Sequence, residues 1–364
     1  MSNYFPWDSH SDQPYVLKRE TKKALRKGHG LDYLKLILTN LIYFPYLFIK
    51  FVGSILSNKY KTFDKIEPTA FKKFYGLCVN LDKGEEQYKL IEELSIKSLQ
   101  IRVFLNDIEN LQNYVEFAKG FGEDKEILIT IIQDREHIEN HELLAKDITT
   151  IFKAFNSIAN EFQIGNAINR IKWGFVSIEE YLSFYEMVQR VRDEQFKEIK
   201  LIGSAVIDFE YHFSIRTLFN GFKVHYDKFS TLLYVDRRGS PYSTQMGIFD
   251  FRNKIEFLDS IVKSSSKSEN AIYITEANWP LSGTAPYAPT SEKECVSEEL
   301  YNKYMLEYFD IALKSQKIEK LFWHQLIATG YGLVDNRNGK IRKTKAFYTF
   351  KNFVGCDCHR IDKR

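Results

Sequence analysis

A glutamate ends an apolar run that has the length and composition of a buried strand. The run reads Ile272-Tyr273-Ile274-Thr275-Glu276, and Ala277-Asn278-Trp279-Pro280 follows it. A carboxylate held rigidly on such a strand end, in a partly dry cavity, can attack or stabilise an oxocarbenium-like carbon. Glu276 is therefore the first candidate catalytic residue.

Eight short apolar runs alternate with segments of helical spacing from residue 71 onward. This alternation favours a parallel sheet closed into a (β/α)8 TIM barrel over residues 71–355, with a doubly wound open sheet as the alternative. No glycine-rich loop follows the first run, which argues against a nucleotide-binding sheet. The runs are 74–81, 99–106, 127–133, 162–166, 200–208, 231–236, 271–276 and 320–325, and helical spacing marks 85–96, 178–192 and 296–314.

Barrel enzymes carry their chemistry at the carboxyl ends of the strands, so polar residues that follow the runs are candidate site residues. Asp208 and Glu210, after the fifth run, are further candidate catalytic carboxylates. Trp279 and Trp323 are predicted to stack against a sugar ring. The candidates for substrate binding are Arg102, Asn166, Asn169, Arg170, Tyr234, Asp236 and Arg237.

Three stretches, 164–170, 274–280 and 322–325, together resemble the clan of (β/α)8 glycoside hydrolases whose acid/base and nucleophile glutamates end the fourth and seventh strands. The resemblance implies that Glu276 is the nucleophile and that Asn166 hydrogen-bonds a sugar hydroxyl beside the reacting carbon. Arg102 would hold the neighbourhood of the nucleophile. The acid/base position falls on Ala167, and alanine cannot transfer a proton.

Four interpretations of Ala167 remain open. The alanine replaces a glutamate by engineering, or another carboxyl, such as Asp208, Glu210 or Asp236, serves as the acid. Alternatively, the leaving group needs little help or the substrate's own carboxylate assists, or the barrel binds glycans without cleaving them. The missing group matters because general acid catalysis contributes about 10²–10⁴-fold.

Arginines near the predicted mouth indicate an acidic ligand. Arg170 follows the fourth run, and Arg237 follows the sixth. Guanidinium groups recognise carboxylate or phosphate through paired hydrogen bonds, so we expect an acidic sugar or a phosphorylated glycan. The alternative is that Arg237 and Arg238 form a solvated loop pair, bridged to Asp236 or Asp208.

The composition excludes other classes. A net charge of +3 over 364 residues gives no case for nucleic acid, and the four scattered cysteines are no disulfide framework. A reducing compartment follows from the cysteines. Neither a cofactor nor a metal site is expected.

The N-terminal region differs from the barrel. Residues 1–30 are polar and basic and are predicted to be flexible, and residues 31–60 form an apolar segment interrupted by Pro45. A basic cluster beside an apolar, aromatic-rich segment is typical of an interfacial anchor on an anionic leaflet. The alternative is a helical hairpin packed on the barrel bottom. Residues 356–364 are expected to be a tail.

Together these features are similar in outline to membrane-associated hydrolases that remove a Kdo residue from lipid A precursors. The similarity implies an acidic glycolipid of the bacterial envelope as substrate and a peripheral or monotopic position on the cytoplasmic face of the inner membrane. The rival interpretation is a catalytically lapsed glycan-binding barrel, or one subunit of a two-protein hydrolase.

Overall fold

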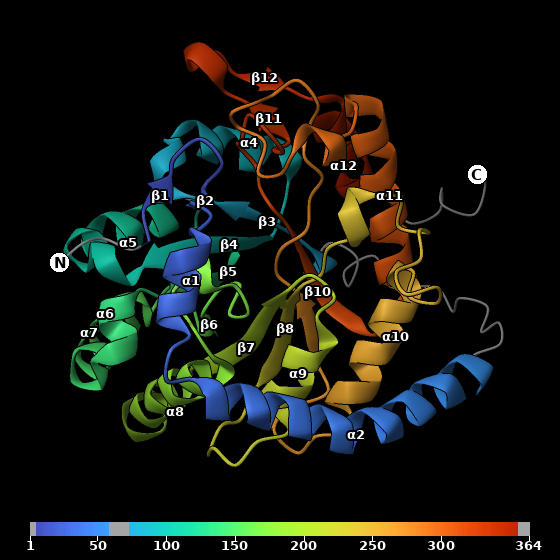
Figure 1. Ribbon diagram of the computed structural model, residues 1–364. Helices are drawn as coiled ribbons and strands as arrows, with labels where there is room; N and C mark the ends of the chain where they lie inside the picture. Colours follow the sequence, from blue (N-terminus) through green and yellow to red (C-terminus); the bar gives the residue numbers. More distant parts are fainter. Residues whose placement is uncertain (1–4, 58–72, 356–364) are drawn as a thin grey trace.

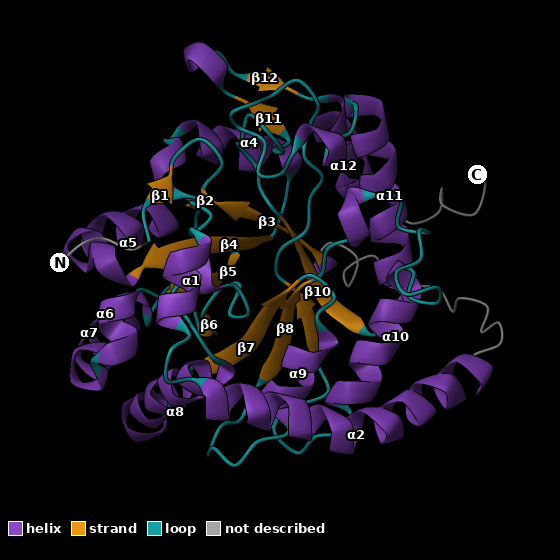
Figure 2. Ribbon diagram, in the orientation of Figure 1, coloured by secondary structure: helices purple, strands orange, loops and turns teal. Residues whose placement is uncertain are grey.

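Eight parallel strands close into a barrel in chain order (Figures 1 and 2). The computed structural model describes residues 5–57 and 73–355. The last barrel strand pairs with the first, Leu321 lying opposite Tyr75. The predicted (β/α)8 barrel is thus confirmed. The strands are β3 (Tyr75–Val79), β4 (Ser98–Phe104), β5 (Glu126–Ile132), β6 (Glu161–Ile164), β7 (Lys200–Ile207), β8 (Lys228–Leu232), β9 (Ile272–Ile274) and β10 (Ile318–Trp323).

Side chains, not solvent, occupy the middle of the barrel. Leu128, Ile202, Tyr273 and Phe322, from four different strands, form a buried hydrophobic cluster of their own. Gly76 on β3 leaves room for this cluster, because a Cβ there would lie 2.4 Å from the Phe322 ring. A filled interior confines any cavity to the barrel mouth.

Helices surround the barrel, and short polar side chains fix where several of them begin. Ser177, for example, accepts a hydrogen bond from the backbone of Glu180 at the start of one helix, the usual role of an N-cap serine. The surrounding helices are α4 (Glu86–Leu94), α5 (Leu111–Lys119), α6 (Arg135–Glu139), α7 (His141–Phe155), α8 (Ile178–Gln195), α9 (Tyr211–Leu218), α10 (Phe251–Val262), α11 (Glu298–Ser315) and α12 (Lys345–Gly355).

The segment expected to be flexible is ordered from residue 5 onward. Strands β1 (Trp7–Asp8) and β2 (Gln13–Pro14) form a hairpin in front of the barrel mouth, and α1 (Arg19–Leu25) follows it (Figure 1). Asp12 fixes the hairpin to the barrel, because its carboxylate accepts hydrogen bonds from Lys83 at 2.9 Å and from Gln325 at 2.8 Å. The predicted tail, 356–364, lies outside the described residues.

The apolar segment is one continuous helix, α2 (Gly30–Ser57), and not a hairpin. It runs through Pro45 and lies across the outside of α9 and α10 (Figure 1). Leu47 and Phe51 are buried against the barrel domain. Among the described residues, α2 alone is long and apolar enough to cross a membrane by length and composition.

We predict that α2 contributes to the stability of the barrel domain. Leu47→Ala is expected to lower the free energy of unfolding by about 2–5 kcal/mol, because Leu47 is fully buried and the truncation leaves a cavity. Leu41→Ala, on the exposed face of the same helix, is the control, with an expected change within about 0.5 kcal/mol. Urea unfolding of both variants measures the difference, and equal effects would mean that α2 does not pack as described.

Candidate active site

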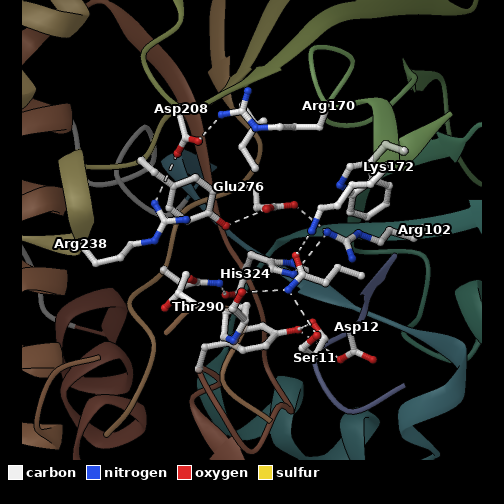
Figure 3. A pocket seen from close by; sticks show the side chains of 17 residues that line it. Ser11, Asp12, Arg102, Arg170, Lys172, Asp208, Arg238, Glu276, Thr290 and His324 are labelled. Carbon is white, nitrogen blue, oxygen red and sulfur yellow. Dashed lines mark hydrogen bonds and ion pairs between the residues drawn. The ribbon is translucent and has the colours of Figure 1, made fainter. Parts of the chain in front are cut away.

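A small cavity lies at the carboxyl ends of the strands, under the hairpin (Figure 3). Its volume is about 170 Å³, below the roughly 300–1,000 Å³ of most small-molecule sites. The hairpin contributes Asp12 and Gln13 to the lining, and the loop after β9 contributes Thr290. The mouth is therefore largely covered in this structure.

Glu276 faces this cavity, as the sequence predicted. Each of its carboxylate oxygens accepts one hydrogen bond: Arg102 Nη2 donates to Oε2 at 2.6 Å, and the Tyr234 hydroxyl donates to Oε1 at 2.7 Å. The residue is only 7% exposed. Two hydrogen bonds fix the orientation of the carboxylate and leave other lone pairs on its oxygens free. An oriented carboxylate with free lone pairs suits a nucleophile.

The donors around Glu276 keep their protons. Burial alone would lower the pKa of Arg102, but Glu276, together with Cys78, Tyr331 and Asp12, raises that pKa above its usual value. Burial, followed by Glu276, raises the pKa of Tyr234 well above its usual value. Burial, reinforced by Arg102, holds the pKa of His324 well below its usual value, so its neutral Nε2 lies 3.2 Å from Arg102 Nη2 as an acceptor.

Ala167 does not line the cavity, although the same loop carries Arg170 and Lys172 to it. It is fully buried, with a φ of 47°, and packs in a cluster that includes Trp173 and Tyr234. Asn166 beside it is also buried; its backbone N–H donates to Gln133 Oε1, and its side-chain Nδ2 has no hydrogen-bond partner among the described residues. Asn166 does not line the cavity.

The two other candidate carboxylates lie at the far rim. Arg170 joins them, with Nη2 2.6 Å from Asp208 and Nη1 2.8 Å from Glu210. Asp208 and Arg170 line the cavity, whereas Glu210 does not. Asn169 donates to Glu210 and to the backbone of Ile207, so it ties the loop after β6 to β7 instead of facing a ligand.

The predicted stacking of sugar on Trp279 and Trp323 is wrong. Both side chains are buried, and their rings stack on each other with centroids 5.9 Å apart. The Trp323 indole donates to the Tyr301 hydroxyl, so it belongs to the packing between β10 and α11. The indole that lines the cavity is Trp173.

The placement of Asp236 and Arg237 in the mouth is also wrong. Both are exposed on the short 3-10 helix η4 (Asp236–Arg238), outside the cavity lining. Arg238 lines the cavity instead. Its guanidinium lies 3.6 Å from the centre of the Tyr234 ring and 3.5 Å from Asp208.

Lys172 is the functional candidate that the sequence reasoning missed. It lies in η3 (Ile171–Trp173), directly after the loop of Ala167, and lines the cavity beside Glu276. Its position two residues after Arg170, in the loop after a predicted strand, could have indicated a place in the mouth. No pattern in the sequence indicates that the hairpin residues lie at the mouth. Among the described residues, no group of three potential metal ligands comes together.

Comparisons with known proteins agree on the architecture. No family model and no curated protein sequence matches the chain. Its structure is similar to a β-glucosidase from Thermotoga maritima in complex with deoxynojirimycin (14% identity, TM-score 0.57, covering 81% of this chain and 99% of that one). It is also similar to virulence factor SghA from Agrobacterium tumefaciens (9%, 0.56, 79% and 99%) and to a GH2 β-galacturonidase from Eisenbergiella tayi bound to galacturonate (13%, 0.53, 78% and 51%). The chain therefore has the (β/α)8 fold of glycoside hydrolases.

We predict that the Arg102–Glu276 pair is an interdependent unit. Arg102→Met is expected to lower the free energy of unfolding by about 3–5 kcal/mol, because it leaves the buried Glu276 charge without its cation. The double variant Arg102→Met/Glu276→Met removes both charges and is expected to recover most of that loss. Urea unfolding of the single and double variants tests this, and additive losses would show that the two side chains are not coupled.

Proposed function

We propose that this protein processes glycosidic bonds, with Glu276 as nucleophile or charge stabiliser. The main support for this proposal is the position of Glu276. It follows a barrel strand and lines the mouth cavity, and Arg102 and Tyr234 orient its two carboxylate oxygens. A fixed, partly desolvated carboxylate can stabilise an oxocarbenium-like transition state without reorganising during the reaction. The similarity of the barrel to a β-glucosidase, a β-galacturonidase and a β-xylosidase supports the same reaction class.

The charges around the cavity support an acidic substrate. Four cationic side chains line it against three carboxylates, a balance of 4 − 3 = +1. The cations are Arg102, Arg170, Lys172 and Arg238, and the carboxylates are Asp12, Asp208 and Glu276. A similar barrel is described as binding galacturonate, an acidic sugar. We infer an acidic glycan or glycolipid, with Kdo of the lipopolysaccharide core as one sugar that fits this chemistry.

The outer face of α2 supports a position on a membrane. Its apolar side chains are exposed at spacings of three and four residues, whereas Leu47 and Phe51 on the opposite face are buried. The exposed residues include Leu34, Ile37, Leu38, Leu41, Ile42, Ile49, Val52 and Leu56. A helix with one face packed on the protein suits insertion in the interfacial plane, about 5–10 Å deep, better than a span.

Nearby basic side chains indicate which lipids this face meets. Lys18, Arg19, Lys23, Arg26 and Lys27 are exposed in and around α1, immediately before α2. Basic residues near a surface contribute about 1 kcal/mol each towards an anionic leaflet. We infer monotopic attachment to the cytoplasmic face of the inner membrane, where an envelope glycolipid precursor would be the substrate.

The second candidate function is glycan binding without hydrolysis, alone or beside a partner subunit. The apolar packing around Ala167 favours it, because this residue lies in a hydrophobic cluster with Trp173 and Tyr234 and has no proton to transfer. Activated glycosides distinguish the two candidate functions. A hydrolase would cleave them, whereas a barrel that has lost its activity would bind them without cleavage.

We predict that Glu276→Gln abolishes turnover of an activated aryl glycoside of an acidic sugar. The loss is expected to exceed about 10³-fold, since removing a single stabilising group already costs about 10²–10³-fold. Glutamine preserves the shape, so circular dichroism should report an unchanged fold. Glu109→Gln, exposed outside the cavity, is the control and should retain wild-type rates. Full activity of Glu276→Gln would remove this residue from the mechanism.

We predict that replacing Leu41, Ile42 and Ile49 together by serine weakens binding to phosphatidylglycerol vesicles at least about tenfold. Each lost apolar side chain removes on the order of 1 kcal/mol of binding free energy from burial in the lipid. A loss of about 1.4 kcal/mol lowers the binding constant tenfold. Vesicle flotation at low and high salt measures it.

The control carries serine at Leu300, Ile341 and Tyr348, which are exposed apolar residues far from α2. It should float with the vesicles as the wild type does. A wild-type protein that stays in solution with anionic vesicles, or that loses binding equally in both triple variants, would contradict the assignment of α2 as the membrane face.

A further inference from the structure

A lysine reaches into the cavity from the same loop that lacks the acid. Lys172 follows β6 by way of Ala167 and Arg170, and its Nζ donates to Gln13 Oε1 of the hairpin at 2.6 Å. Figure 3 shows its side chain pointing towards Glu276, and both residues line the same cavity. The loop that has alanine at position 167 thus supplies an amino group to the cavity.

The other charged groups of the cavity, apart from Lys172, are held in ion pairs. Asp12 is in an ion pair with Lys83 at 2.9 Å, and Asp208 is held between Arg170 and Arg238. Guanidinium groups do not release protons in proteins. In contrast, the hydrogen-bond partner of Lys172 is a neutral amide.

We propose that Lys172 is the general acid and base of this site, in place of the carboxyl group absent at Ala167. The inference rests on the proposed function. In the first step Glu276 attacks the anomeric carbon, the glycosidic C–O bond breaks, and the Lys172 ammonium gives its proton to the leaving oxygen. In the second step the Lys172 amine takes a proton from water, whose oxygen attacks the same carbon and releases the Glu276 carboxylate.

The electrostatics of the cavity suit both steps. The pKa of Lys172 is lowered to about 8, chiefly by burial; Glu276 and Asp8 oppose this shift, and Arg170 and Lys22 add to it. The ammonium form therefore predominates at neutral pH, with a pKa near the operating pH as acid catalysis requires. Once Glu276 is esterified, its negative charge is gone and the pKa of Lys172 falls, so the amine becomes available as the base.

The test compares two glycosides of one acidic sugar, such as galacturonic acid or Kdo, with dinitrophenol and with a simple alcohol as leaving groups. Lys172→Met is expected to lose about 10²–10⁴-fold on the alkyl glycoside, whose leaving group needs a proton. Formation of the glycosyl-enzyme from the dinitrophenyl glycoside should be retained, and azide should restore its turnover as a glycosyl azide. The fall of wild-type activity above about pH 8 should be absent from Lys172→Met.

Two variants separate catalysis from charge and packing. Lys172→Arg keeps the positive charge but cannot release a proton, so it should share the defect of Lys172→Met. Lys254 is a matched control, because burial also lowers its pKa to about 8 and it does not line the cavity. Lys254→Met should keep the wild-type dependence on pH and on the leaving group.

Two outcomes overturn the role of Lys172 and leave the proposed function standing. The first is an equal loss of Lys172→Met activity on both glycosides. The second is a Lys172→Met variant whose activity still falls above about pH 8. An NMR titration of Lys172 gives a readout without turnover, since Glu276→Gln should lower its midpoint, and an unchanged midpoint would refute the coupling. A wild-type protein that turns over neither glycoside overturns the proposed function, and the role of Lys172 with it.

Discussion

The contact between Arg102 and Glu276 is the constraint that organises this molecule. The two residues lie 174 positions apart in the chain, at the ends of β4 and β9, and both are buried. Removing two charges from water costs several kcal/mol per ion, and only close, fully hydrogen-bonded geometry offsets that cost. The pairing is possible because β10 closes the sheet onto β3, so that only these two strands lie between β9 and β4. Tyr234, Arg102 and His324 then keep the protonation states that hold the carboxylate in place.

The end of β6 has the opposite character. Ala167, which follows β6, packs there with Trp173 in an apolar cluster. Lys172 lies on the same loop, two residues after Arg170, and as the proposed acid a lysine changes the chemistry in two ways. Its proton leaves at a higher pH than that of a carboxylic acid, and its charged form adds to the positive field that favours an anionic substrate.

The barrel and its principal carboxylate could be predicted from the sequence because both depend on local patterns. Short apolar runs specify strands, and a glutamate that ends such a run faces the mouth by topology alone. The aromatic residues could not be assigned in the same way, since a shift of one position turns a side chain from the mouth to the surrounding helices. Trp323 is such a case, and it packs against Tyr301. The choice between Arg237 and Arg238 depends on left-handed backbone at both residues, which no propensity of arginine indicates. Asp12 meets Gln325 across 313 positions, and no local pattern reports a contact of that range.

The course of α2 connects the cavity to the proposed membrane surface. Each barrel helix begins near the mouth and ends near the bottom of the barrel. The start and the end of such a helix therefore show which end of the barrel a contact lies at. Near its start, α2 touches the mouth side, where the Tyr33 hydroxyl donates to the backbone of Val176 in the loop before α8. Near its end it reaches the bottom, where Lys50 donates to Ser264 beyond the end of α10. A helix of 28 residues spans about 42 Å, so a bilayer that meets its apolar face also meets the rim of the mouth. α1, with seven residues, is the main element between that face and the hairpin that covers the cavity. In the membrane position proposed above, a lipid-linked substrate would approach the mouth from the side of α1 and the hairpin that covers the cavity.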